Sequence, residues 1–304
     1  MNMAPDIKWV RAGSIDRLKW DQCMDQAENS RIYGYSWYLD AMAENWDALV
    51  LGDHEWIMPL PWRSKYGIRY IYQPFLCAQL GIFGKPLTVE LTRQFIEAIP
   101  ACFRLAEISL NPGNSGAPHS LIRNNYVLDL RPSYEQLYQQ YRENIQRNTK
   151  KAFQLGCQVT FEIGVEQVIG LALSQMHKTD KNIERNIQLF NKLYELLKIK
   201  QEATIYGING PDGQLLASAV FFFSKGRAYY ILVGNHPNGR TIGASHALID
   251  AFIKDHSGQQ LLLDFEGSDI RNLAFFYSSF GAGLEQYPFL KWNRLPAWLK
   301  WLKS

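Results

Sequence analysis

Residues 229–281 read YYILVGNHPNGRTIGASHALIDAFIKDHSGQQLLLDFEGSDIRNLAFFYSSFG, and this stretch decides the fold. It opens with an apolar run typical of a buried strand. A polar loop then leads into helical spacing from about 241 to 255. The run LLLDFEG predicts a second strand, and 269–280 returns to helical spacing. This order predicts a sheet that is covered by helices.

The loop before the helix at 241–255 has the composition of an anion-binding site. A helix N-terminus presents N–H groups without partners and carries a partial positive charge. Small residues at such a terminus let a phosphate group approach the backbone. Arg240, Gly243, Ala244 and Ser245 fit this role. An ordinary strand–loop–helix connection explains the same spacing and stays open as the alternative.

Two further residues in this stretch are candidates for chemistry. Glu266 follows the apolar run of the second strand, where carboxylates often meet clefts, and its alternative is a solvated loop position. Tyr277 shares one helix face with Ile270, Leu273 and Ala274. Periodicity alone therefore favours a core tyrosine at position 277.

The element order of 204–266 occurs a second time at 49–110: strand, strand, turn, strand, loop, helix, strand. WRSKYGIRYIYQ at 62–73 aligns beside FFSKGRAYYILV at 222–233, with Lys65 opposite Lys225. A repeat at this level indicates two copies of one unit. We therefore expect an α+β fold, an α/β sandwich of two tandem units. Each unit has a mixed, mostly antiparallel sheet flanked by helices.

The expected domains are 1–132 and 133–304, joined by a helix over 133–155, with a tail at 285–304 that packs back on one of them. The apolar residues of the joining helix form one stripe: Tyr134, Leu137, Tyr138, Tyr141, Ile145 and Ala152. Arg142, Arg147, Lys150 and Lys151 fall on the opposite side. This basic side is either an ordinary solvated face or a surface for a polyanion such as tRNA. Near the N-terminus, 14–28 predicts a helix with Ser14 as its N-cap.

The motifs of 229–281 resemble those of the GNAT acyltransferase superfamily. Arg240-x-x-Gly243-x-Ser245 matches its pyrophosphate loop, Q/R-x-x-G-x-G/A, except at the last position, and Tyr277-Ser278-Ser279-Phe280-Gly281 matches its Tyr-x-x-x-Gly motif. The duplication and the run DFEGSDIRNLAFFYSSFGA at 264–282 are similar to the FemAB group of tandem acyltransferases. The first copy has QPFLCAQLGIFGKP, at 73–86, in place of the loop.

The resemblance implies an N-acyltransferase that moves an acyl group from acyl-CoA to the amine of a small molecule or peptide. Arg240, Gly243, Ala244 and Ser245 would bind the donor phosphates. The strand near Val233 and Gly234 would offer an N–H to the thioester carbonyl. Glu266 would act as the base, and Tyr277 as the acid.

Two other functions remain open at this point. A FemAB-like enzyme would use an aminoacyl-tRNA donor and a cell-wall precursor as acceptor, and Arg142, Arg147, Lys150 and Lys151 would meet the tRNA. A non-catalytic binding protein on the same fold is the other alternative. Two departures from the family pattern favour it: Ser245 at the last position of the loop, and Asn272, which lies five residues before Tyr277 where the family has its Asn seven residues before.

Composition narrows the remaining possibilities. The 304 residues carry a net charge of +3, which by itself gives no argument for nucleic-acid binding. The four cysteines include no CxxC pair, and the six histidines form no HxH or HExxH motif, so no metal site is expected. No apolar run approaches the roughly 18 residues of a membrane span. The first 13 residues also lack a signal-peptide h-region. We expect a cytoplasmic protein with no membrane span, and the sequence leaves its oligomeric state open.

Overall fold

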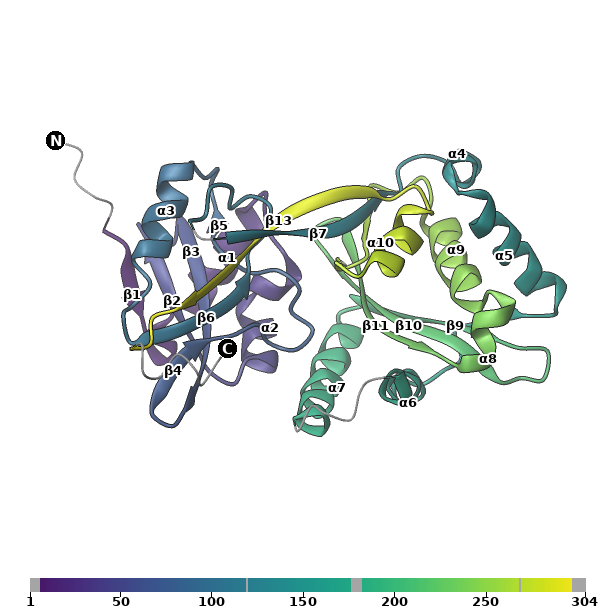
Figure 1. Cartoon of the computed structure of the whole chain (residues 1–304), viewed down its shortest axis with the longest axis horizontal. Coiled ribbons are helices and arrows are strands. Elements are labelled where there is room, and N and C mark those ends of the chain that lie inside the picture. The colour runs from purple at the N-terminus through teal and green to yellow at the C-terminus, as the bar shows by residue number, and fades with distance from the viewer. Residues whose placement is uncertain (1–5, 119, 176–181, 268, 297–304) are drawn as a thin grey trace. The chain divides into compact units, whose positions relative to one another are not determined.

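The computed structural model describes residues 6–118, 120–175, 182–267 and 269–296. The chain forms two compact units (Figure 1). Unit 1 comprises Met1–Arg123 with Gln286–Ser304, and unit 2 comprises Asn124–Glu285. These bounds differ from a division at residues 132 and 133, because the chain returns to unit 1 after completing unit 2.

Unit 1 contains one mixed sheet in the order β1-β2-β3-β4-β6-β13, with β5 paired to β3. All pairs in it are antiparallel except β4 with β6. The last strand, β13, comes from the end of the chain. The bounds are β1 Lys8–Val10, η1 Ala12–Ser14, α1 Arg17–Gln26, η2 Ile32–Gly34, α2 Ser36–Met42, β2 Trp46–Leu51, β3 Trp56–Lys65, β4 Ile68–Ile71, β5 Phe83–Gly84, α3 Val89–Glu97, β6 Phe103–Ser109 and β13 Gly283–Asn293.

Unit 2 contains a sheet in the order β7-β12-β11-β10-β9-β8, in which only β11 and β12 run parallel. In Figure 1, α6 and α7 lie on one face of this sheet, and α5, α9 and α10 lie on the other. The bounds are β7 Ser120–Asp129, α4 Tyr134–Gln140, α5 Glu143–Gln154, β8 Gln158–Thr160, α6 Val165–Gln175, α7 Ile183–Ile199, β9 Ala203–Asn209, β10 Leu215–Ser224, β11 Arg227–Asn235, α8 Pro237–Ile242, α9 Ala244–His256, β12 Leu262–Asp264 and α10 Arg271–Ser278.

The two units repeat one topology, as the element order predicts. In unit 1, β2, β3 and β4 are antiparallel, and the chain passes through α3 to β6, which is parallel to β4. In unit 2, β9, β10 and β11 are antiparallel, and the chain passes through α8 and α9 to β12, which is parallel to β11. The expected fold class, mixed and mostly antiparallel sheets flanked by helices, is confirmed.

The residue alignment of the two copies needs a correction of one position. The β3–β4 turn is Tyr66-Gly67, and the β10–β11 turn is Lys225-Gly226; all four residues have positive φ. Two-residue hairpin turns of this kind need positive φ at both central positions. Lys225 therefore corresponds to Tyr66, and Lys65 is the last residue of β3.

The continuous helix expected over 133–155 is wrong, because it divides into α4 and α5. Tyr141 and Arg142 between them have extended ψ values of 137° and 151°. The amide of Arg142 donates to the carbonyl of Ser279 at 2.9 Å, and the ring of Tyr141 packs edge-on against Phe280, 5.2 Å between centroids. These tertiary contacts hold the break in place against local helical spacing.

Two smaller expectations concern the chain ends. The first helix begins at Arg17 and not near Ser14, since Asp16 accepts a hydrogen bond from the amide of Lys19 at 3.1 Å and serves as the N-cap. Within the tail at 285–304, strand β13 pairs with β6 from Phe289 to Asn293. Residues 297–304 lie outside the described part of the chain.

An aromatic layer between α9 and the sheet forms the core of unit 2 near the site. Phe221 of β10 stacks on Phe252 of α9 at 3.8 Å between ring centroids. Tyr206 and Tyr230, from the strands on either side of β10, meet Phe221 edge-on or tilted at 5.5 and 5.2 Å. This packing fixes α9 over the sheet, and its N-terminus lies next to the end of β11.

Candidate functional site

A cavity of about 440 Å³ lies in unit 2 where β11 ends, α8 meets α9, and α10 passes. Four of the residues singled out in the sequence line it: Val233, Arg240, Ser245 and Tyr277. The other lining residues are Gln175, Tyr230, Asn235, Gly239, His246, Leu273 and Phe276. The strand end, the loop and the Tyr-x-x-x-Gly helix therefore meet at one cavity, although up to 44 positions separate them in sequence.

The loop places Gly243 at the junction of α8 and α9 in a left-handed conformation, with φ of +84°. A Cβ at this position would lie 2.5 Å from the backbone oxygen of Asn148 on α5. Glycine thus lets α9 pack closely on α5. Gly243 and Ala244 are buried and do not line the cavity with side chains, but they begin α9. The amide of Gly243 donates to the carbonyl of Gly239 at 3.1 Å, and the amide of His246 donates to the carbonyl of Gly243 at 3.0 Å. The amides of Ala244 and Ser245 are therefore the first-turn groups left to meet an anion.

Ser245 and Arg240 are placed differently around this helix start. The hydroxyl of Ser245 donates to Oδ1 of Asn235 at 2.6 Å, which ties the first turn of α9 to the end of β11. Arg240 is exposed at the rim of the cavity. An exposed guanidinium beside a helix N-terminus is a favourable combination for an anion.

Val233 and Gly234 point to opposite faces of β11, as successive strand residues do. Val233 lines the cavity. A Cβ on Gly234 would lie 2.5 Å from the Cβ of Leu171 on α6. The absence of a side chain at position 234 therefore serves the packing of α6 on the sheet.

Tyr277 is buried at the base of the cavity and stacks on Phe265 at 4.6 Å. It also meets Tyr230 edge-on at 6.4 Å. Burial, and to a smaller extent the negative charge of Glu266, raises the pKa of Tyr277 to about 12. The phenol therefore stays protonated at neutral pH, which is the form that a proton donor needs.

Glu266 lies close enough to Tyr277 for this electrostatic effect, but it is not among the residues that line the cavity. Its backbone has a positive φ of 62°, and its amide donates to Oδ1 of Asp264 at 2.8 Å. Glu266 is half-buried in the turn that follows β12.

His246 lines the cavity and was not found by sequence reasoning. Its Nε2 lies 3.3 Å from Nδ2 of Asn148, its ring meets Phe276 edge-on at 5.0 Å, and its Nδ1 is buried without a partner. Burial lowers the pKa of His246 to about 4. Its position directly after the loop motif was the only available signal.

The break before α5 separates Arg142 from the other three basic residues expected on one helix face, Arg147, Lys150 and Lys151. Arg142 precedes α5, with its guanidinium 4.7 Å from the centre of the Phe275 ring. Lys151 donates to the carbonyl of Thr241 at 2.8 Å. Arg147 and Lys150 are exposed on α5.

Neither a metal centre nor a membrane segment appears in the described part of the chain. Its histidines, cysteines and carboxylates form no group of three or more that is arranged to hold a metal ion. Among the same residues, no helix combines the length and the apolar character that crossing a membrane requires.

Comparison with known proteins shows which protein family part of unit 2 resembles. Residues 139–269 match the family described as acetyltransferase (GNAT) domain. No curated protein matches the chain by sequence. Among solved structures, FemX covers 92% of this chain and 96% of its own, with 11% identity and a TM-score of 0.62.

Two further structures are similar over nearly the whole chain. A tandem GNAT protein from the clavulanic acid biosynthesis pathway has 12% identity and a TM-score of 0.55, and the match covers 96% of this chain and all of the other. The C-terminal domain of a putative lysylphosphatidylglycerol synthetase from Agrobacterium fabrum has 10% identity and a TM-score of 0.53, with 93% and 92% covered.

Residues 139–269 of unit 2 thus match the GNAT acetyltransferase family, and the cavity is lined both by residues of this matched stretch and by residues of α10 beyond it. The chain as a whole has a FemAB-like tandem GNAT fold, with the family match confined to residues 139–269.

Proposed function

We propose that this protein transfers an acyl group from acyl-CoA to an amine, with the donor held in the cavity at the start of α9. The observation that carries the proposal is the convergence of Val233, Arg240, Ser245 and Tyr277 on one cavity. The first three of these residues lie within 139–269, the stretch that matches the GNAT family. Arg240 and the first-turn amides of α9 would hold the donor phosphates. The backbone near Val233 would meet the thioester carbonyl.

The chemistry is direct attack of the amine nitrogen on the thioester carbon, followed by departure of the thiolate. An amine with a pKa of about 10.4 is neutral in only about one molecule in 10³ at pH 7, so a base or a desolvated site must supply the neutral form. Glu266 would take this proton directly or through water. Tyr277 would give its proton to the leaving sulfur.

The test is acetyl-CoA binding, by titration calorimetry, combined with transfer to a panel of amines followed by mass spectrometry. We expect Ser245→Asp to weaken acetyl-CoA binding at least tenfold, because a carboxylate would face the donor phosphates while remaining compatible with a helix N-terminus. Gln188→Glu, which adds the same charge on an exposed turn of α7, is the control. If Ser245→Asp binds acetyl-CoA as tightly as the parent, the donor site lies elsewhere. Binding without transfer to any amine would favour a non-catalytic binding protein.

A FemAB-like enzyme with an aminoacyl-tRNA donor is the second candidate, supported by the FemX-like fold and by the exposed Arg147 and Lys150. Binding of tRNA would then weaken with salt, with a log–log slope of about −0.7 for each phosphate contact on a single strand. The double variant Arg147→Gln, Lys150→Gln should flatten that slope by about one unit or more and leave acetyl-CoA binding unchanged. A protein without salt-sensitive tRNA binding would exclude this candidate.

A further inference from the structure

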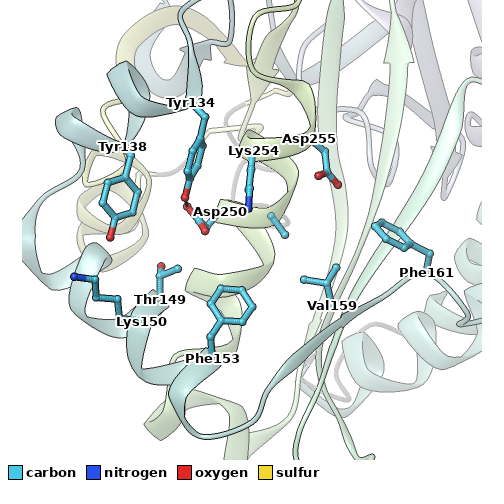
Figure 2. Close-up of a pocket in the computed structure, with 11 residues that line it drawn as sticks. Tyr134, Tyr138, Thr149, Lys150, Phe153, Val159, Phe161, Asp250, Lys254 and Asp255 are labelled. Carbon is cyan, nitrogen blue, oxygen red and sulfur yellow. Dashed lines mark hydrogen bonds between the residues drawn. The ribbon is translucent and has the colours of Figure 1, made fainter.

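The break between α4 and α5 leaves a second hollow in unit 2, over the C-terminal half of α9 (Figure 2). Its volume is about 530 Å³, and it shares no lining residue with the cavity at the start of α9. Helices α4, α5 and α9 line it together with β8 and the residue that follows it. The lining residues are Tyr134, Tyr138, Thr149, Lys150, Phe153, Val159, Phe161, Asp250, Ala251, Lys254 and Asp255.

The walls of this hollow are mainly aromatic. Tyr134 and Tyr138 come from α4, Phe153 comes from α5, and Val159 and Phe161 come from the edge of the sheet (Figure 2). Phe153 is 42% exposed and Phe161 is 57% exposed. Large apolar rings exposed around a concavity are a mark of a ligand site.

The polar groups of the hollow include two that are almost fully buried. Asp250 is 4% exposed, and its Oδ1 accepts a hydrogen bond from the hydroxyl of Tyr134 at 3.0 Å. Thr149 is also 4% exposed, and its hydroxyl oxygen has no partner. A threonine inside a helix commonly bonds to the carbonyl one turn earlier, but Thr149 does not. Buried hydroxyl groups in proteins are normally hydrogen-bonded, so this hydroxyl is available to bond to a ligand.

Lys254 brings an opposite charge to the same hollow. It lies one helical turn after Asp250 on α9, and its ammonium nitrogen is 5.8 Å from the centre of the Tyr134 ring (Figure 2). Burial raises the pKa of Asp250, while the Tyr134 hydrogen bond and the charge of Lys254 oppose that rise. Within the described residues, no ion pair joins Asp250 to Lys254. One hollow therefore presents a carboxylate and an ammonium group that do not neutralise each other by contact.

We propose that this hollow binds a zwitterionic α-amino acid with a large apolar side chain. The ligand ammonium would meet Asp250 and Thr149, the ligand carboxylate would meet Lys254, and the side chain would lie among the four aromatic rings. A ligand with only an amine would be repelled by Lys254, and one with only a carboxylate would be repelled by Asp250. The proposal is independent of acyl transfer.

The first experiment compares four probes by calorimetry and by ligand-observed NMR on the full chain. L-phenylalanine and L-tryptophan should bind with a Kd of about 1 mM or below. We expect 2-phenylethylamine and 3-phenylpropanoate, which each carry one of the two charges, to bind at least tenfold more weakly. Absence of binding by both amino acids would overturn the proposal. Equal binding of a single-charge probe would also overturn it, since the opposite charge would then have no role.

The second experiment locates the site. Asp250→Asn keeps an acceptor for Tyr134, and Lys254→Met alters an exposed side chain and is expected to leave folding intact. Each variant should weaken amino-acid binding at least tenfold. Lys192→Met, an exposed lysine on α7, is the matched control. Unchanged binding in Lys254→Met would place the ligand elsewhere, whatever the folding of Asp250→Asn.

Discussion

At the scale of single residues, Tyr277 is both a core side chain and a candidate proton donor. Its periodicity predicts a core tyrosine, and it is buried, yet it also lines the cavity at the start of α9. Both descriptions are correct, because the ring packs in the core while burial raises the pKa of the phenol further above neutral pH.

We predict that Tyr277→Phe lowers kcat by about 10²-fold to 10⁴-fold, the usual contribution of a general acid, and leaves the affinity for acetyl-CoA unchanged. The variant keeps the ring that stacks on Phe265. Because the pKa of Tyr277 is about 12, the parent should keep its activity well above neutral pH. Steady-state kinetics across pH would check both points. If Tyr277→Phe has the kcat of the parent, Tyr277 is not the acid and has only a structural role.

His246 should make stability depend on pH. Its pKa is lowered to about 4 from an ordinary 6.5, so the folded state binds fewer protons than the unfolded state between these values. The resulting stability is complete above about pH 6.5 and is lost as the pH falls toward 4. We predict that His246→Gln reduces the acid destabilisation in this range by at most about 3 kcal/mol. Urea unfolding at several pH values measures the free energy of unfolding of the parent and of His246→Gln. His256→Gln, which replaces a partly exposed histidine, is the control. If the free energy of unfolding depends on pH in the same way in the parent and in His246→Gln, the prediction is wrong.

At the scale of elements, one glycine controls how α9 meets α5. Gly243→Ala would combine a left-handed φ of +84° with a Cβ only 2.5 Å from the backbone of Asn148. We predict a loss of about 2–4 kcal/mol in the free energy of unfolding. Gly258→Ala is a matched control, because Gly258 has a φ of +79° and nothing within 4 Å of its Cβ position. The free energy of unfolding of Gly258→Ala should fall by only about 1 kcal/mol, because this variant has the cost of the left-handed backbone but no steric overlap. Equal losses in a denaturant titration would show that the contact with α5 is unimportant.

Helices α4 and α5 show a feature that the local spacing of apolar residues does not predict. The run from Tyr134 to Ala152 has helical spacing throughout, and Leu137, Ile145 and Ala152 are buried as that spacing requires. The apolar spacing gives no sign of the break at Tyr141, where Nε2 of Gln146 donates to the carbonyls of Tyr138 and Tyr141 at 3.1 and 3.3 Å. The break is also held by Ser279 and Phe280, which are more than 130 positions away in sequence. The same break creates the aromatic hollow over α9.

At the scale of the whole molecule, a buried ion network joins residues of unit 2 that are distant in sequence. Arg227 of β11 donates to Asp264 of β12 at 2.6 Å and to Glu285 of β13 at 3.2 Å. Asn125 of β7 donates to both carboxylates as well. The network therefore connects both ends of the unit 2 segment to its central strands.

Removing the charge of Arg227 should be costly, because its guanidinium pairs with the buried carboxylate of Asp264 and with the carboxylate of Glu285. We predict that Arg227→Met destabilises unit 2 by about 3–5 kcal/mol. Arg131→Met removes an arginine that pairs with Asp129 at an exposed position and should leave the unfolding midpoint unchanged. Denaturant unfolding followed by circular dichroism compares the two. A small effect of Arg227→Met would mean that water reaches the carboxylates and replaces the arginine.

The sequence by itself determined the repeat, the fold class and the position of the loop motif. These features depend on local signals: strand runs, positive-φ turns, and glycine next to a helix start. Tertiary structure alone decided the rest. In the structure, Gly234 and Gly243 allow close packing of α6 and α9, and Glu266 is not among the residues that line the cavity. His246 lines the cavity although the sequence did not predict it, and β13 pairs with β6 in the sheet of unit 1. The physical reason is that the direction and burial of a side chain depend on contacts with residues far away in sequence. The local spacing of apolar and polar residues does not contain this information.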